Sequence, residues 1–130
     1  MPNSLDTAKA LYDAYAKRDI DGVMDRIADD MIFRWPAQAE FIPFSGTWDG
    51  KAGFLAFLQS LDERYDFNRF EPIDMIADGE RVAVRITTTV TSKATGRQAS
   101  FESAQFWRFR DGKAVELIEI FDTAAVASIG

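Results

Sequence analysis

Apolar and polar residues alternate most regularly in the last third of the chain. Valine, isoleucine or threonine occupies every second position from Val82 to Val90, and most residues between them are polar. A period of two is typical of a strand with one buried face. Turns at 94–96 and 110–113 separate this strand from two others, the last of which runs to Asp122. The pattern therefore predicts three long antiparallel strands in this part of the chain.

The middle strand of this group places two polar residues inside an apolar stripe. Its inward face carries Phe101, Ser103, Gln105 and Trp107. A buried hydroxyl or amide needs a hydrogen-bond partner, so a core built only for stability would not favour these two residues. A polar spot on the inner face of a curved sheet is instead typical of a pocket for a small molecule.

Helical spacing dominates the first half of the chain. Apolar residues recur every three or four positions in three segments, and each segment follows a residue that can cap a helix. The predicted helices, with their capping residues, are 4–18 (Asn3 or Ser4), 20–27 (Asp19) and 51–64 (Asp49). We expect the third helix to bury one face through Phe54, Leu55, Leu58 and Leu61.

Two further strands and one long loop complete the predicted order. Met31–Trp35 and Phe70–Ile76 have the composition of strands, and the loop over 36–49 is long enough to be a binding segment. Because helices precede most strands, we expect the α+β class. The predicted architecture is a cone-shaped, curved antiparallel sheet wrapped around three N-terminal helices, with a pocket between them. The 130 residues suit a single domain.

Composition removes several classes of function. The chain has no cysteine and no histidine, which excludes thiolate nucleophiles, zinc–thiolate sites and histidine-dependent nucleophiles. We expect neither a metal nor a cofactor. A net charge of -6 argues against nucleic acid or an anionic membrane as a partner. The start of the chain lacks signal-peptide features and no apolar run approaches membrane-spanning length, so a cytoplasmic location is expected.

Three motifs make the chain similar to the SnoaL-like branch of the nuclear transport factor 2-like superfamily. They are Ala28–Met31, Phe106–Lys113 and Glu119–Thr123. The resemblance implies a cystatin-like α+β barrel over nearly the whole chain. Members include ketosteroid isomerases, polyketide cyclases, limonene-epoxide hydrolases and non-catalytic binding domains, and most are homodimers. It therefore implies a small apolar or aromatic ligand, polyketide- or steroid-like. Either cofactor-independent isomerase, cyclase, lyase or hydrolase chemistry or simple binding would follow.

The working residues of two such enzyme families are mostly missing from this chain. The general base and the two oxyanion donors of ketosteroid isomerases fall on Trp35, Leu11 and Gln105, of which only Gln105 can serve as a donor of that kind. The carboxylate that activates water in limonene-epoxide hydrolases falls on Glu119, whereas its tyrosine and asparagine partners fall on Phe33 and Trp35. The resemblance thus leaves Glu119 as the catalytic candidate, acting as an acid or a base.

Whether Glu119 faces the pocket depends on the preceding turn. A two-residue turn at Asp111-Gly112 would place Glu119 opposite Ala104, on the outer face. A three-residue loop with a bulge, and with Gly112 in the left-handed conformation, shifts the register by one and places Glu119 opposite Ser103. The resemblance favours the second arrangement.

In that arrangement the carboxyl group of Glu119 would lie among aromatic side chains. Desolvation would raise its pKa, which suits proton transfer near neutrality. The alternative is a structural acid paired with Arg34 or Arg85. The residues expected to contact a ligand are Tyr15, Phe33, Trp35, Phe44, Trp48, Thr88, Phe101, Ser103, Gln105, Trp107, Leu117 and Phe121.

The outer face of the same strands is also apolar. It carries Ala104 and Phe106 and, in the bulged register, Ile118 and Ile120. An exposed apolar patch usually marks a partner surface, so we expect a homodimer formed through the convex face of the sheet. The alternative is a C-terminal segment that folds back over this patch. Asp122 is expected to cap a short helix in that segment.

Overall fold

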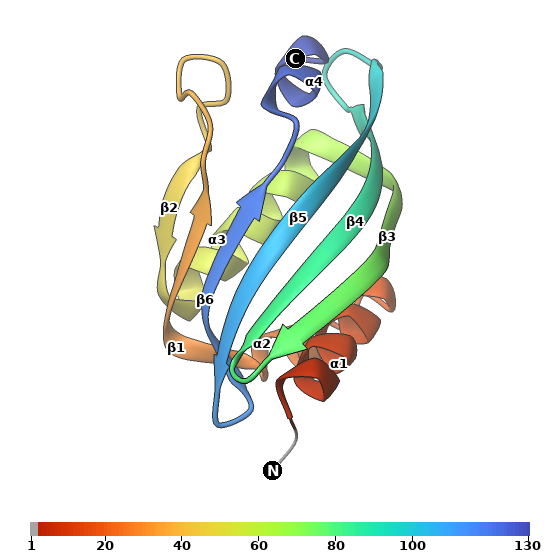
Figure 1. Ribbon diagram of the computed structural model, residues 1–130. Helices are drawn as coiled ribbons and strands as arrows, with labels where there is room; N and C mark the ends of the chain where they lie inside the picture. Colours follow the sequence, from red (N-terminus) through yellow and green to blue (C-terminus); the bar gives the residue numbers. More distant parts are fainter. Residues whose placement is uncertain (1–2) are drawn as a thin grey trace.

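The computed structural model describes residues 3–130 and shows a six-stranded sheet with four helices (Figure 1). The helices are α1 (Ser4–Ala16), α2 (Ile20–Met24), α3 (Gly50–Arg64) and α4 (Thr123–Ser128), and the strands are β1 (Ile27–Trp35), β2 (Gly46–Asp49), β3 (Tyr65–Asp78), β4 (Arg81–Ser92), β5 (Gln98–Arg110) and β6 (Lys113–Ile120). This arrangement confirms the α+β class.

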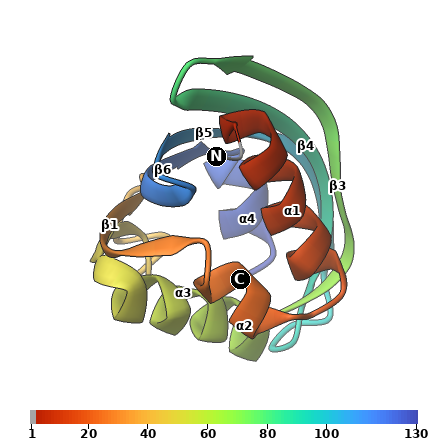
Figure 2. The same ribbon diagram turned by 90° about the horizontal axis from the view of Figure 1, so that it is seen from below.

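The strands follow the order β2-β1-β6-β5-β4-β3, which leaves β2 and β3 as free edges. The sheet is therefore curved but does not close into a barrel. It is also not wholly antiparallel, because β1 runs parallel to β6. Seen from below, the sheet curves around α1 and α4, and α3 packs against β1 on the concave side (Figure 2). The predicted cone around helices is thus present, with α4 as an additional element inside it.

Capping side chains begin three of the helices where the sequence predicts. Asn3 accepts a hydrogen bond from the Asp6 amide, Asp19 from the Gly22 amide and Asp122 from the Ala125 amide. Each of these bonds satisfies a backbone N–H that has no partner inside its own helix. Asp49 also precedes a helix, but its side chain makes no such bond.

Several element boundaries differ from the prediction, and β1, for example, begins at Ile27 and not at Met31. The expected loop over 36–49 ends in β2, which pairs with β1, and β3 extends well beyond 70–76 at both ends. The second helix stops at Met24 because Ile27 is fully buried in the sheet, where it pairs with Ala114. In α3 the buried residues are Phe54 and Phe57, while the predicted leucines are only partly buried.

The hairpin between β5 and β6 combines features of both predicted registers. Asp111 and Gly112 form a two-residue turn with φ angles of 53° and 77°, as a type I′ turn requires. A bulge in β6 then inserts one extra residue, because Arg108 pairs with Glu116 while Phe109 pairs with Ala114. The predicted three-residue loop is therefore wrong.

The bulge also decides the partner of Glu119. Beyond it, Gln105 faces Glu119, whereas the prediction placed Ser103 there. The prediction that Glu119 points inward is nevertheless confirmed. A two-residue turn without a bulge would point Glu119 outward, and a shift of the register by one residue in either direction turns it inward.

The C-terminal helix covers the concave side and not the convex patch. Val126 of α4 is buried and contributes to the inner cavity, while Phe106 and Ile120 on the convex face remain about half exposed. The predicted alternative, a C-terminal segment folded over the patch, is therefore not what the described residues show. Among residues 3–130, no helix is both long and apolar enough to span a membrane.

Candidate functional site

A cavity lies between the concave face of the sheet and helices α1 and α3. The cavity contains about 800 Å³ of space between protein atoms, including its open mouth. The centre of a water molecule can occupy about 80 Å³ of this space. Its walls are mostly aromatic and aliphatic, and Glu119 is the one carboxylate among the described residues that line it. The cavity is thus narrow and apolar, with a single acidic group.

Stacked aromatic rings support the wall beside the carboxylate. The indole of Trp35 lies against the ring of Phe121, with centroids 4.1 Å apart and planes inclined by 11°. Phe44 stacks on Trp35 with a centroid distance of 5.1 Å, and Phe57 meets it edge-on at the same distance. These contacts hold the Trp35 indole in one orientation.

A chain of hydrogen bonds, here called the Glu119 cluster, joins five side chains: Tyr12, Trp35, Gln105, Trp107 and Glu119. Trp107 Nε1 donates to the Tyr12 hydroxyl at 2.8 Å, and this hydroxyl donates to Gln105 Oε1. Gln105 Nε2 donates to Glu119 Oε1 at 2.6 Å, and Trp35 Nε1 donates to Glu119 Oε2 at 3.2 Å. Each carboxylate oxygen therefore accepts one hydrogen bond and keeps a further lone pair.

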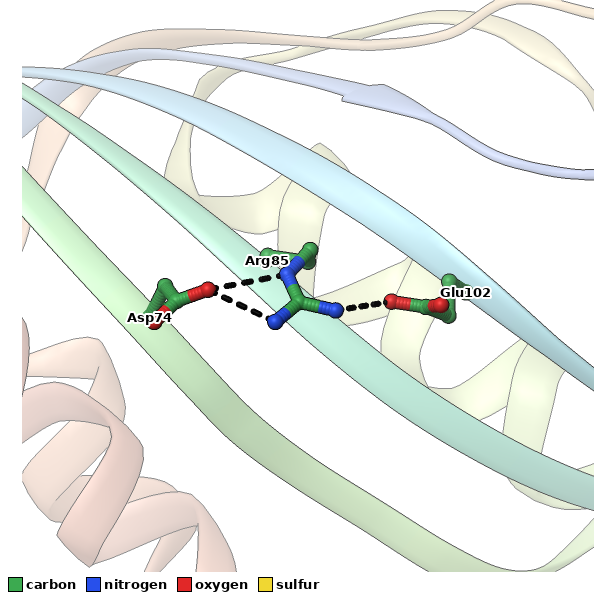
Figure 3. A network of polar contacts seen from close by, with 3 residues as sticks. All are labelled: Asp74, Arg85 and Glu102. Atoms are coloured by element: carbon green, nitrogen blue, oxygen red, sulfur yellow. Dashed lines mark hydrogen bonds and ion pairs between the residues drawn. The ribbon is translucent and has the colours of Figure 1, made fainter.

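Burial sets the acidity of this carboxyl group. Desolvation raises the pKa of Glu119, and the hydrogen bonds from Gln105 and Trp35 oppose that rise because they favour the charged form. No ion pair joins Glu119 to a lysine or arginine within the described chain. Arg85 instead binds Asp74 and Glu102 on the convex face (Figure 3), so it does not partner Glu119.

Two tyrosines of α1 reach the cavity, and both remain neutral near pH 7. Burial raises the pKa of the Tyr15 phenol to about 12 and that of Tyr12 further still. Both phenols therefore keep the proton that a hydrogen-bond donor needs. Tyr15 lies at the end of α1, where the Arg18 guanidinium carbon is 5.7 Å from the centre of its ring.

The structure brings most of the predicted ligand-contacting residues together around the cavity. Those that line it with Glu119 are Tyr15, Phe33, Trp35, Thr88, Phe101, Gln105, Trp107 and Leu117. Four others lie outside its lining: Phe44, Trp48, Ser103 and Phe121. Phe44 and Phe121 support Trp35, Trp48 packs on Phe57, and the Ser103 hydroxyl is buried without a hydrogen-bond partner among the described residues.

Sequence reasoning missed several residues of this site. The lining residues not predicted as ligand contacts include Tyr12, Phe54, Phe57, Leu58, Leu61, Phe67 and Phe70. Two signals pointed to Tyr12: it has the helical spacing of the buried face of the first helix, and a buried Gln105 requires a donor or acceptor from another element. No group of three or more acidic side chains in residues 3–130 is arranged to hold a metal ion.

Comparisons with known proteins agree on the fold. The sequence profile of the SnoaL-like domain family matches residues 8–117. A search of curated proteins finds no match to this chain.

Several solved structures resemble this chain over nearly its whole length. A nuclear transport factor 2-like protein of unknown function from Burkholderia pseudomallei is 31% identical, with a TM-score of 0.88 over 99% of this chain and 98% of that one. TerC co-crystallised with polyporic acid is also 31% identical, with a TM-score of 0.86 over 97% and 96%. A suspected polyketide cyclase from Pseudomonas putida, 18% identical with a TM-score of 0.80 over 99% and 98%, shares the fold alone.

Proposed function

Because this chain belongs to the SnoaL-like domain family, we propose that its cavity binds a small, flat, mainly apolar molecule from which Glu119 removes a proton. The ligand class is aromatic or polyketide-like. It is supported by the narrow aromatic walls and by the likeness to a structure that was co-crystallised with polyporic acid. The proposed chemistry is a cofactor-independent isomerisation or cyclisation.

The observation that carries this proposal is a carboxylate on an apolar wall that accepts two hydrogen bonds and pairs with no cation of residues 3–130. Desolvation makes such a carboxylate a stronger base than one in water, because nothing but two hydrogen bonds compensates its charge. A C–H or O–H beside a ligand carbonyl would give its proton to a free lone pair of Glu119. The same carboxyl group would then return the proton to another atom of the ligand, so no cofactor is needed.

A second candidate is a non-catalytic binding domain. It is favoured by the fact that Glu119 stands alone, since the other titratable groups among the described lining residues are the tyrosines Tyr12, Tyr15 and Tyr65. In that case the carboxylate would accept a hydrogen bond from the ligand without moving a proton.

Replacement of Glu119 by Gln separates these two candidates. Binding is measured by quenching of tryptophan fluorescence, because Trp35 and Trp107 both line the cavity. Polyporic acid is the first probe, followed by a panel of flat aromatic ketones, with turnover followed by chromatography and mass spectrometry. Glu116→Gln is the matched control, since Glu116 lies on the same strand but belongs to the convex face.

The two candidates predict different results. Catalysis requires turnover by the parent protein and by Glu116→Gln, with a loss of at least 100-fold in Glu119→Gln while binding persists. Binding without turnover in all three proteins supports the non-catalytic domain. Absence of binding to any of the compounds contradicts both.

We also propose that two copies of the chain associate through the convex face of the sheet. Ile76, Ala83, Phe106 and Ile118 form one row across β3, β4, β5 and β6, and this row lines a shallow groove. Nearby, Arg85 already binds both Asp74 and Glu102, so this rim needs no charged partner (Figure 3). A self-complementary apolar patch of this kind suits a two-fold dimer.

The dimer is tested by Phe106→Glu, which places a charge in the centre of the row. Sedimentation velocity should show a dimer for the parent protein and a monomer for the variant, with unchanged circular dichroism. Lys113→Glu, at the exposed hairpin turn, is the control and should remain dimeric. A parent protein that sediments as a monomer at 100 µM, on the order of the weakest dimers of interest, would refute the proposal.

A further inference from the structure

The hydrogen bonds of the Glu119 cluster have a direction that begins at Trp107. An indole N–H can only donate, so the Tyr12 hydroxyl must act as the acceptor of the 2.8 Å bond. The single proton of that hydroxyl is then free to be donated elsewhere, and it points to Gln105 Oε1. Because the carbonyl end of the amide is occupied in this way, its NH₂ end faces Glu119.

The hydrogen bonds of the Glu119 cluster are buried, so a lost partner is hard to replace. Tyr12, Gln105 and Trp107 are all buried, with at most 8% of any of them exposed, so bulk water cannot readily replace a lost partner. If the amide of Gln105 turned over, its carbonyl oxygen would face the carboxylate of Glu119. Two acceptors would then oppose each other, and only a protonated Glu119 could satisfy the contact.

We infer that Tyr12 is a positioning residue that acts on Glu119 through Gln105. Its hydroxyl holds the amide with Nε2 toward the carboxylate and thereby favours the ionised, proton-accepting form. This inference rests on the proposed role of Glu119 as a base. It assigns a purpose to two buried polar residues of the inner wall, Tyr12 and Gln105, that packing alone does not explain.

The direct test is the acidity of Glu119 in the ligand-free protein. Carbon-13 labelling of glutamate carboxyl groups allows titration by NMR, and the Glu119 signal is identified by its loss in Glu119→Gln. The other titratable groups among the described lining residues are Tyr12, Tyr15 and Tyr65, and burial raises the pKa of each, so all three stay neutral at neutral and acidic pH. A change in the titration midpoint therefore reports on the immediate surroundings of Glu119, which are its burial and its hydrogen bonds.

Tyr12→Phe should raise the midpoint of Glu119 by about one pH unit, because the released amide no longer donates steadily to the charged form. Tyr15→Phe removes a phenol from the same helix that has no bond to Gln105, and it should leave the midpoint unchanged. Gln105→Leu, which removes the amide itself, should raise the midpoint at least as far as Tyr12→Phe.

The double variant distinguishes a positioning role from a structural one. If Tyr12 acts through Gln105, then adding Tyr12→Phe to Gln105→Leu produces no further shift. An unchanged midpoint in Tyr12→Phe, or an equal additional shift in the double variant, overturns the inference. Should Tyr12→Phe fail to fold by circular dichroism, Trp107→Phe tests the same chain one step earlier and should shift the midpoint in the same direction.

This experiment separates the inference from the function on which it rests. A shift in Tyr12→Phe together with full turnover in Glu119→Gln would refute the proposed function but leave the positioning contact intact. The absence of a shift, with turnover lost in Glu119→Gln, would refute only the role of Tyr12.

Discussion

Replacing Trp35 by Phe tests how the protein stabilises the ionised form of Glu119. The variant keeps an aromatic ring between Phe44 and Phe121 but removes the indole N–H that donates to Glu119 Oε2 at 3.2 Å. A hydrogen bond to a charged group contributes about 2 kcal/mol, and one to a neutral group about 1 kcal/mol. The loss of stability caused by Trp35→Phe should therefore be about 1 kcal/mol greater when Glu119 is ionised than when Glu119 is protonated.

The sign of the pH dependence follows from the raised pKa. Folded protein holds the Glu119 proton more tightly than the unfolded chain, so the contribution of Glu119 to stability falls as the pH rises from about 4.3, the unfolded value, through the raised folded pKa. Trp35→Phe raises the folded pKa of Glu119 further, because it removes one of the two hydrogen bonds that favour the charged form. The decline in stability should be larger in the variant and should extend to a higher pH.

Thermal unfolding followed by circular dichroism between pH 4.5 and 9 measures this effect. For 130 residues, 1 kcal/mol corresponds to about 4 °C in Tm, so Trp35→Phe should lose about 4 °C more at pH 9 than at pH 4.5. Trp48→Phe is the matched control, because its indole N–H donates to the Phe44 carbonyl and not to a carboxylate. An equal loss in both variants at every pH would show that the Trp35 indole does not stabilise the ionised form of Glu119.

Further variants test the carboxylate itself, the aromatic core and two glycines with positive φ. Glu119→Gln should remove the contribution of Glu119 to the pH dependence of stability above about pH 4.3, as measured by urea unfolding at a series of pH values, and an unchanged pH dependence would contradict the raised pKa of Glu119. Phe57→Ala should lower the free energy of unfolding by about 4 kcal/mol, because its buried ring contacts those of Phe33, Trp35 and Trp48, and a loss below about 2 kcal/mol would contradict this packing. Gly50→Ala should cost about 2 kcal/mol in the same assay, since φ is 77° and the new Cβ would lie 3.1 Å from the Asp29 carbonyl oxygen, whereas Gly79→Ala, with positive φ but open space around it, should cost less.

Local patterns were sufficient for most of the fold. Caps at Asn3, Asp19 and Asp122 and the alternation along β4 are properties of short segments, and the structure reproduces them. The free edges of the sheet and the length of β3 depend instead on how strands pair with one another. The sequence of a short segment does not specify this pairing.

The candidate site shows the same division within a single strand. The inward face of β5, with Gln105 and Trp107, follows from a period of two, and so does the conclusion that one of two registers turns Glu119 inward. Only the folded sheet places the bulge in β6, and this bulge makes Gln105, and not Ser103, the neighbour of Glu119. An extra residue in β6 does not change the alternation of buried and exposed positions in β5, so the bulge cannot be predicted from the sequence of β5.

Composition alone established that the chain lacks histidine and cysteine chemistry, and periodicity indicated helices on one side of a half-buried sheet with a polar spot among aromatic residues. Periodicity left two registers for Glu119, and only the family resemblance favoured the one that turns it inward. Contacts between distant residues decided the rest. Tyr12 meets Gln105 across 93 positions of sequence, and Trp35 meets Glu119 across 84. Such pairings depend on the curvature of the sheet and the docking of α1, because side chains far apart in the chain become neighbours only when the whole core packs.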